Sequence, residues 1–295
     1  MASKIDLHVH TTASDGTITP KALVAQAKAA GIGTLAVTDH DTVAGVAQAR
    51  TEGERLGVEV LPGIEISADY NGVDTHILGY GIDVDDPHLG QILTWVIDER
   101  NARNEKIAAL MRADGIDVTI EALEERYPGA TIGRPHFARA MVEQGRAASV
   151  PEAFQNWLSR GKPYYLPRVH LSMEQAVAAI RRSGGIAVLA HPLQYRYSDE
   201  GLRALVARAA GLGVAGMEIY YTGYTPEQRE TLHALAREFG LIVTGGSDFH
   251  GDNKPQIRLG ALEVPGDILL PLNAKLAEPA SDRDPDVPLP GCHPS

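Results

Sequence analysis

The chain has 295 residues, 44% of them hydrophobic, which is enough to bury a large core. Its 27 basic and 38 acidic residues give a net charge of −11, which excludes binding of duplex nucleic acid through bulk electrostatic attraction. The single cysteine, Cys292, excludes a disulfide framework. The chain starts without a signal-like segment, and no apolar run approaches the roughly 20 residues that span a bilayer. We therefore expect a cytoplasmic protein with no membrane contact.

Short apolar runs rich in β-branched residues alternate with helical patterns along most of the chain. This rhythm predicts an α/β fold of parallel strands joined by crossover helices. The expected strands are Lys4–His10, Thr34–Thr38, Val58–Leu61, Thr75–Tyr80, Ile186–Ala190, Gly216–Tyr220 and Leu241–Thr244. The clearest helix is capped by Thr19, has Pro20 in its first turn and ends at Gly31.

The rhythm breaks after Asp83. From 86 to 161 the pattern is helical with glycine and proline punctuation, which predicts an inserted helical subdomain. The flanking segments, 1–85 and 162–276, would form one discontinuous α/β domain. The segment 277–295 is rich in proline and aspartate and poor in large apolar residues, so we expect it to be disordered.

Histidines and carboxylates gather at the ends of the expected strands. Alternation along the first strand places Asp6, His8 and His10 on one face. Asp15 follows in a loop and His76 begins a later strand. Further candidates at later strand ends are Asp39, His40, Asp41, Glu65, His191, Asp248 and His250. Catalytic groups collect at that end of the strands in parallel α/β barrels, so the repeated placement indicates an active site.

Imidazole and carboxylate are ligands for Zn²⁺, Mn²⁺ or Fe²⁺, and this set exceeds what one ion can use. The sequence therefore predicts two or three divalent ions. Any one of these residues taken singly could instead cap a helix or satisfy a backbone group. Asp6, Asp39 and Asp41 are expected to orient ligating imidazoles, with loop capping as the alternative.

These motifs resemble the polymerase and histidinol phosphatase (PHP) superfamily over residues 1 to about 265. The resemblance rests on Asp6-Leu7-His8-Val9-His10, Thr38-Asp39-His40, Gly63-Ile64-Glu65, His191-Pro192 and Ser247-Asp248-Phe249-His250. It implies a distorted (β/α)7 barrel, in which the helical insertion would act as a lid over the substrate, and a three-metal centre.

The resemblance also implies how the ligands are shared between the ions. The three implied sets are His8, His10, Glu65 and Asp248; Glu65, His76 and His191; and Asp15, His40 and His250. Glu65 would bridge the first two ions, and the residues implied to take part in catalysis are His8, His10, Glu65, His191 and Asp248. Several relatives have histidine where this chain has Asp15, which leaves occupancy of the third site open. Mn²⁺ is the expected metal, with Mg²⁺, Fe²⁺ or Zn²⁺ as alternatives.

Clustered divalent ions bind phosphoryl oxygens and lower the pKa of a bridging water, so the predicted chemistry is phosphoester hydrolysis. Within the insertion, Arg100 and Arg103 fall on an apolar helical stripe beside Asn101, where they would bind a substrate phosphate or pair internally. Arg134 and His136 flank Pro135 at a helix start, which predicts an anion clamp; a solvated arginine and a capping histidine are the alternative.

Two phosphate-binding regions suit a substrate that carries two phosphates. The helical insertion resembles the branch of the superfamily that contains 3′,5′-nucleoside bisphosphate phosphatases and 5′ to 3′ exoribonucleases. We expect hydrolysis of adenosine 3′,5′-bisphosphate to AMP and phosphate. The alternatives are trimming of short 5′-phosphorylated single-stranded oligonucleotides, hydrolysis of histidinol phosphate, amidohydrolase chemistry, and a metal-bound accessory module without turnover.

Overall fold

The computed structural model describes residues 4–167, 169 and 171–278. Its strands are β1 (Lys4–Val9), β2 (Ile32–Val37), β3 (Glu59–Tyr70), β4 (Val73–Tyr80), β5 (Leu171–Ser172), β6 (Ile186–Leu189), β7 (Gly216–Tyr221) and β8 (Ile242–Gly246). They lie in the order β1-β2-β3-β4-β6-β7-β8, and the short β5 pairs with β3 outside this order.

The sheet closes because the main chain after β8 pairs with β1. Asp248 N donates to His8 O at 2.8 Å, and His10 N donates to Phe249 O at 2.9 Å. Inside this nearly closed barrel, Leu7, Leu78 and Val188 are fully buried. The predicted seven-stranded α/β barrel is therefore confirmed.

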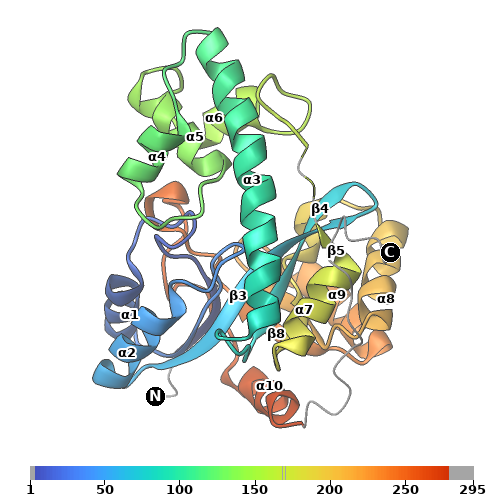
Figure 1. The fold of residues 1–295 in the computed structure, drawn as a ribbon. Helices are drawn as coiled ribbons and strands as arrows, with labels where there is room; N and C mark the ends of the chain where they lie inside the picture. Colours follow the sequence, from blue (N-terminus) through green and yellow to red (C-terminus); the bar gives the residue numbers. More distant parts are fainter. Residues whose placement is uncertain (1–3, 168, 170, 279–295) are drawn as a thin grey trace.

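Six helices cover the outside of the barrel. They are α1 (Pro20–Ala29), α2 (Val46–Leu56), α7 (Met173–Arg182), α8 (Asp199–Gly211), α9 (Pro226–Phe239) and α10 (Leu269–Leu276). Figure 1 shows α1 and α2 on one side of the sheet and α7, α8 and α9 on the other. The Thr19 side chain accepts from Ala22 N at 3.3 Å and Gly31 has a φ of +79°, so the predicted start and end of the first helix are confirmed.

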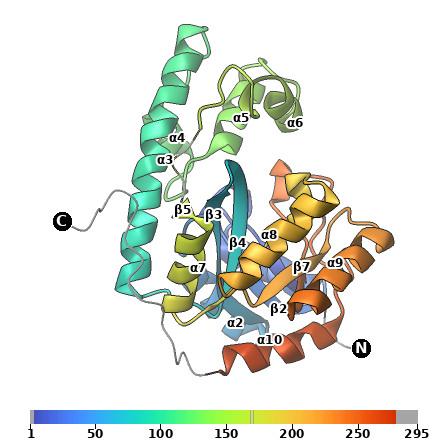
Figure 2. The same cartoon turned by 90° about the vertical axis from the view of Figure 1, so that its right-hand side faces the viewer.

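A second group of helices stands above the barrel (Figures 1 and 2). It comprises α3 (Pro87–Ala113), α4 (Ile120–Arg126), α5 (Arg134–Glu143), α6 (Val150–Ala153) and the π turn η1 (Phe154–Leu158). The first half of α3 packs into the barrel core through Ile92 and Val96, whereas its second half packs with the upper helices through Ile107 and Met111. The helix α3 thus ties both cores together, and the division of the chain into domains stays a prediction.

The prediction that all strands run parallel is wrong at β4. This strand pairs antiparallel with β3 and with β6, and a tight turn at Asn71 and Gly72 replaces the expected crossover helix. The predicted strand Val58–Leu61 is also too short, because β3 continues to Tyr70 and contains Glu65. Alternation of side chains is the same for both strand directions, so it could not reveal the reversal.

Among the described helices, none is both long and apolar enough to cross a membrane. The segment 277–295, expected to be disordered, lies outside the described residues except for Ala277 and Glu278.

Candidate metal centre

The candidate ligands predicted from the sequence lie together at the mouth of the barrel. In chain order they come from β1 or just after it (His8, His10), the loop before α1 (Asp15), the end of β2 (His40), the middle of β3 (Glu65), β4 (His76), the end of β6 (His191) and the end of β8 (Asp248, His250). Because β4 is antiparallel, its histidine reaches the mouth from near the start of the strand.

The ligand atoms form four overlapping groups in which every atom lies within 4.8 Å of the others. The groups are His10, Asp15, His40 and His250; His8, Glu65 and His191; His8, His10 and Asp248; and His40, Glu65 and His76. The structure thus brings all nine predicted ligands together. Their division between individual ions stays a prediction.

Glu65 lies at the centre of this cluster and is 1% exposed. Its Oε1 lies 2.8 Å from His76 Nδ1 and 2.9 Å from His191 Nε2. Its Oε2 lies 3.1 Å from His10 Nε2 and 3.3 Å from His8 Nε2. Oε2 also lies 3.1 Å from His40 Nδ1. One carboxylate therefore faces five imidazoles through its two oxygens, which is the arrangement that a bridging ligand needs.

Three observations fit the cluster to divalent metal ions. The Nε2 atoms of His8 and His10 lie 3.1 Å apart, a separation that needs a shared proton or cation between two lone pairs. His40 Nδ1 and Glu65 Oε2 lie 3.1 Å apart, yet both are buried without a hydrogen bond of acceptable geometry among the described residues. Buried polar groups are normally satisfied, and neutral imidazole with carboxylate is a common donor set for Mn²⁺, Fe²⁺ and Zn²⁺.

The electrostatics of the cluster follow from burial and from its mixed charges. Burial lowers the pKa of His10, but contacts with Asp248 and Glu65 outweigh it and raise this pKa to about 9. Burial also lowers the pKa of His76, and Glu65 and Asp74 raise it to about 10. Burial dominates at His40, where it lowers the pKa to about 3.

The carboxylates of the cluster are held in their charged form. Burial raises the pKa of Glu65, but the surrounding imidazoles outweigh it and hold this pKa well below its usual range. The same balance applies to Asp15 beside His250, and to Asp248 beside Lys254. The cluster therefore presents anionic oxygens to any ion that enters it.

Backbone strain is concentrated at the same place. Five described non-glycine residues have positive φ, and three of them belong to the site or its support: Asp41 (54°), His191 (25°) and Asp248 (57°). Such conformations cost of the order of 1–3 kcal/mol each and persist only where the surroundings enforce them. These three side chains are therefore oriented by backbone conformations that cost stability.

The prediction that Asp6 and Asp39 orient ligating imidazoles is wrong, and the loop-capping alternative fits. Asp6 accepts from Ser247 N at 2.8 Å. Asp39 accepts from Thr11 N at 2.7 Å and from Ser14 Oγ at 2.6 Å. Their hydrogen-bond donors are backbone and hydroxyl groups, so these carboxylates fix the loops that carry the ligands.

The carboxylate that orients imidazoles is Glu218, in the middle of β7, which the sequence analysis missed. Its Oε1 lies 3.0 Å from His8 Nδ1, and its Oε2 accepts from His191 N at 2.8 Å. The side chain is fully buried. A single acid inside the apolar strand Gly216–Tyr221 was the available signal, because a buried charge needs partners.

Two further residues missed by the sequence analysis support Asp248. Tyr221 Oη and Lys254 Nζ both donate to Asp248 Oδ2, at 2.6 Å and 2.5 Å. The other oxygen, Oδ1, lies 3.3 Å from His10 Nε2. Asp248 thus has one oxygen fixed by donors and the other turned toward the cluster.

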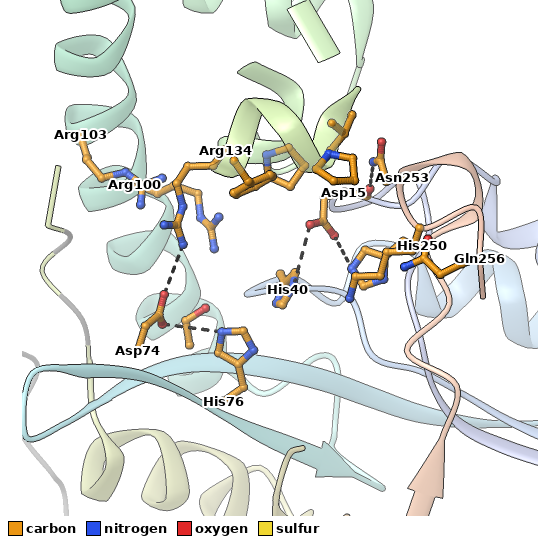
Figure 3. A pocket seen from close by; sticks show the side chains of 16 residues that line it. Asp15, His40, Asp74, His76, Arg100, Arg103, Arg134, His250, Asn253 and Gln256 are labelled. Carbon is orange, nitrogen blue, oxygen red and sulfur yellow. Dashed lines mark hydrogen bonds and ion pairs between the residues drawn. The ribbon is translucent and has the colours of Figure 1, made fainter. Parts of the chain in front are cut away.

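A cavity of about 340 Å³ lies between the cluster and the upper helices, and Figure 3 shows its lining. On the barrel side it is lined by Asp15, His40, His76 and His250. Arg100, Arg103 and Arg134 line the opposite side. The cavity therefore has one wall of candidate metal ligands and one wall of guanidinium groups.

The arginines of this second wall are already engaged with the barrel or their neighbours. Arg100 is 8% exposed and forms an ion pair with Asp41. This internal pairing is the alternative that the sequence offered to a phosphate contact. Arg103 donates to Asn104 Oδ1 at 2.9 Å. Arg134 lies 3.6 Å from Asp74 Oδ2, with its guanidinium over the Tyr165 ring. These contacts hold the guanidinium groups in place and leave them at the cavity surface (Figure 3).

Two predicted substrate residues do not line the cavity. His136 is 3% exposed, and its Nδ1 accepts from Gly133 N at 3.0 Å, so it caps the start of α5 as the alternative proposed. Asn101 is half-buried on α3 and lies outside the lining as well. Phosphate contacts by these two residues stay a prediction.

Comparisons with known proteins agree with this geometry. A family model described as the PHP domain matches residues 6–240. The chain is 42% identical to the 5′-3′ exoribonuclease Rnm of Escherichia coli over 257 residues, which cover 86% of this chain and 87% of that protein. It is 32% identical to the 3′,5′-nucleoside bisphosphate phosphatase of Chromobacterium violaceum, covering 94% and 99%. A structure from Bifidobacterium adolescentis, described as a metal-dependent phosphoesterase, matches with a TM-score of 0.83 at 34% identity, covering 93% of this chain and 97% of that one.

Proposed function

Because this chain belongs to the PHP domain family and is a metal-dependent phosphoesterase of that family, we propose that it hydrolyses nucleoside 3′,5′-bisphosphates, for example adenosine 3′,5′-bisphosphate to AMP and phosphate. The observation that carries the proposal is the two-walled cavity. A substrate with two phosphates can place one at the candidate metal ligands and the other at the arginines.

At the barrel wall, divalent ions would supply positive charge to the phosphoryl oxygens and lower the pKa of an attacking water. We assign their ligands as the family resemblance implies: His8, His10, Glu65 and Asp248; Glu65, His76 and His191; and Asp15, His40 and His250. Mn²⁺ is the first ion to test, because oxygen and imidazole donors suit it and thiolates are absent from the described cluster.

At the helical wall, the arginines bind and orient the phosphate that is not cleaved. Arg100 is fixed by Asp41, and Arg134 is fixed by Asp74 and Tyr165, so little side-chain freedom remains to be lost on binding. Lys254 lines the same cavity next to Asp248 and adds a cationic group near the reacting phosphate.

A second candidate function is 5′ to 3′ removal of nucleotides from short 5′-phosphorylated oligonucleotides. The observation that favours it is the 42% identity to the exoribonuclease of Escherichia coli. The same two walls serve this reaction, because the arginines would bind the 5′ phosphate and the metal side would meet the next phosphodiester. Net charge and the size of the cavity restrict this function to short single strands.

A side-by-side substrate panel tests the proposal. The protein purified with Mn²⁺ is incubated with adenosine 3′,5′-bisphosphate, a 5′-phosphorylated dinucleotide, histidinol phosphate and a cyclic ureide, and products are separated by chromatography. We expect AMP and inorganic phosphate from the bisphosphate. Mononucleotide release from the dinucleotide alone would favour the exoribonuclease, and ureide turnover would favour an amidohydrolase. Bound metal without turnover of any compound would favour an accessory module.

A further inference from the structure

A second cavity adjoins the one described above. It also has a volume of about 340 Å³, and it lies between α5, the start of α6 and the loop after η3 (Gly251–Asn253). Three residues line both cavities: Val150, Pro151 and Asn253. The two spaces are therefore neighbours that share part of their lining.

The volumes indicate why a second space matters. Sites for small molecules usually measure about 300–1,000 Å³, so the first cavity is near the lower end and suits one nucleotide. A substrate with a second nucleotide must continue beyond the first cavity. The adjoining cavity has the same volume as the first and could hold that second nucleotide.

Arg139 is the cationic residue of this second cavity. It is half-buried on α5, and its Nε donates to Asn253 Oδ1, which leaves its other guanidinium nitrogens without a recorded partner among the described residues. Asn253 Nδ2 in turn donates to the backbone oxygen of Asp15 at 2.5 Å. The guanidinium is thus fixed to the loop that carries a candidate metal ligand.

The candidate phosphate-binding groups follow one another across the site. In the view of Figure 3, Arg100 and Arg103 lie on one side of Asp15 and His40, and Asn253 lies on the other. Arg139 contacts Asn253 from the second cavity. A strand whose 5′ phosphate meets the first arginines and whose next phosphate meets the candidate ligands would continue toward Arg139.

Charge and polarity suit one further nucleotide. Two carboxylates line the cavity beside Arg139. Glu143 is paired with Arg126 at 2.5 Å, and Asp252 is exposed. Val142, Val150 and Pro151 offer apolar surface to a ribose or base. A single guanidinium beside two carboxylates, one of them already paired, supports at most one phosphate and does not support a long polyanion.

We propose that this second cavity binds the nucleotide on the 3′ side of the bond that is cleaved. Arg139 would contact the next phosphate, on the 3′ side of that nucleotide. The proposal rests on the proposed phosphoesterase function and deepens it, because it makes short 5′-phosphorylated oligonucleotides a substrate class with its own binding site. It gives Arg139 a role in specificity that the metal ligands do not have.

Equilibrium binding tests the proposal without requiring turnover. The Mn²⁺-loaded protein is titrated with a 5′-phosphorylated trinucleotide whose linkages are phosphorothioates, and separately with AMP, the product that the proposed reaction does not consume. Arg139→Ala should raise the ratio of the trinucleotide Kd to the AMP Kd about tenfold, the size expected for one charge-assisted hydrogen bond. Arg139→Lys, which keeps the charge, should recover part of the loss.

Arg146→Ala is the matched control. It removes the same charge from the loop after α5, where Arg146 donates to Gly115 O and lines neither cavity, so the ratio should stay at the wild-type value. An unchanged ratio in Arg139→Ala would overturn the proposal. Absence of phosphate release from every substrate would instead count against the proposed function, while the binding ratio would still decide the role of Arg139.

Discussion

The Glu218 carboxylate lies 3.0 Å from Nδ1 of His8, although the two residues are separated by 210 positions in the sequence. The contact fixes which ring nitrogen of His8 is left to face the cluster, because the nitrogen next to the carboxylate carries the proton. The same carboxylate accepts from His191 N and so holds a second candidate ligand. One buried acid in β7 therefore positions two imidazoles from different strands.

Substitution of Glu218 should weaken metal binding without removing a ligand. Glu218→Gln keeps the shape but removes the negative charge, and loss of such a partner typically costs about 10–100-fold in metal affinity or activity. We expect isothermal titration calorimetry to show a higher Kd for Mn²⁺ in Glu218→Gln than in the wild type. Glu230→Gln on the exposed side of α9 is the control, and equal affinities in the two variants would contradict this role.

Arg134 should act on substrate and not on metal. Arg134→Ala removes a guanidinium from the helical wall, so KM for adenosine 3′,5′-bisphosphate should rise by about tenfold or more. The Mn²⁺ content, measured by elemental analysis, should match the wild type. Arg160→Ala, which removes an exposed charge that contacts Gly72 O, should leave KM unchanged. Unchanged kinetics in Arg134→Ala would remove this residue from the binding site.

The buried pair between Arg100 and Asp41 should contribute to stability. Arg100→Met leaves the fully buried Asp41 without its cation, which typically costs about 3–5 kcal/mol. Chemical denaturation should show this loss, and Arg100→Met with Asp41→Asn should recover part of it. Breaking the exposed pair of Arg203 with Glu238 by Arg203→Met should cost about 1 kcal/mol or less. Similar losses in both single variants would contradict the burial argument.

Metal affinity should increase with pH. Metal ligands must be neutral imidazoles, but His10 and His76 have pKa values raised to about 9 and about 10, so both carry protons at pH 7 when no ion is bound. Mn²⁺ must displace these protons, and its affinity should rise from pH 6 toward pH 9. Calorimetry in buffers of different ionisation enthalpy should record proton release, and a pH-independent affinity would contradict this assignment.

The same shifts set the pH dependence of the metal-free fold. A histidine whose folded pKa is raised stabilises the fold fully below its unfolded pKa of about 6.5, and that contribution is lost as pH rises through about 9 to 10. Glu65 and Asp248 have depressed pKa values, so their contribution is present above about pH 4 and is lost at lower pH. Metal-free protein should therefore lose stability as the pH rises through about 9 to 10 and as it falls below about 4.

The α/β class and the candidate ligands could be predicted from the sequence because both depend on local patterns, whereas the closed barrel was implied by the family resemblance. Alternation in β1 placed His8 and His10 on one face, and motifs at strand ends led to Asp248 and His250. The direction of β4 was missed, although Asn71-Gly72 is a strong hairpin signal. A hairpin and a crossover produce the same alternation within the strand.

What the sequence left open depends on contacts between distant residues. The partner of Arg100 is Asp41, 59 positions away, and not a neighbour on its own helix. Lys254 reaches Asp248 only because η3 turns the chain back over the mouth of the barrel. His136 caps its own helix, a local role that the sequence offered as one of two alternatives. Tertiary packing decided the partner of Arg100.

The most direct test of the central claim is a titration of metal-free protein with Mn²⁺ in which bound metal and phosphate release from adenosine 3′,5′-bisphosphate are measured on the same samples. Glu65 faces five imidazoles, so Glu65→Gln serves as the matched variant. We expect release to rise with occupancy to at least two ions per chain, and Glu65→Gln to lower it at least about hundredfold. Full occupancy without phosphate release, or equal release in Glu65→Gln, would contradict the claim.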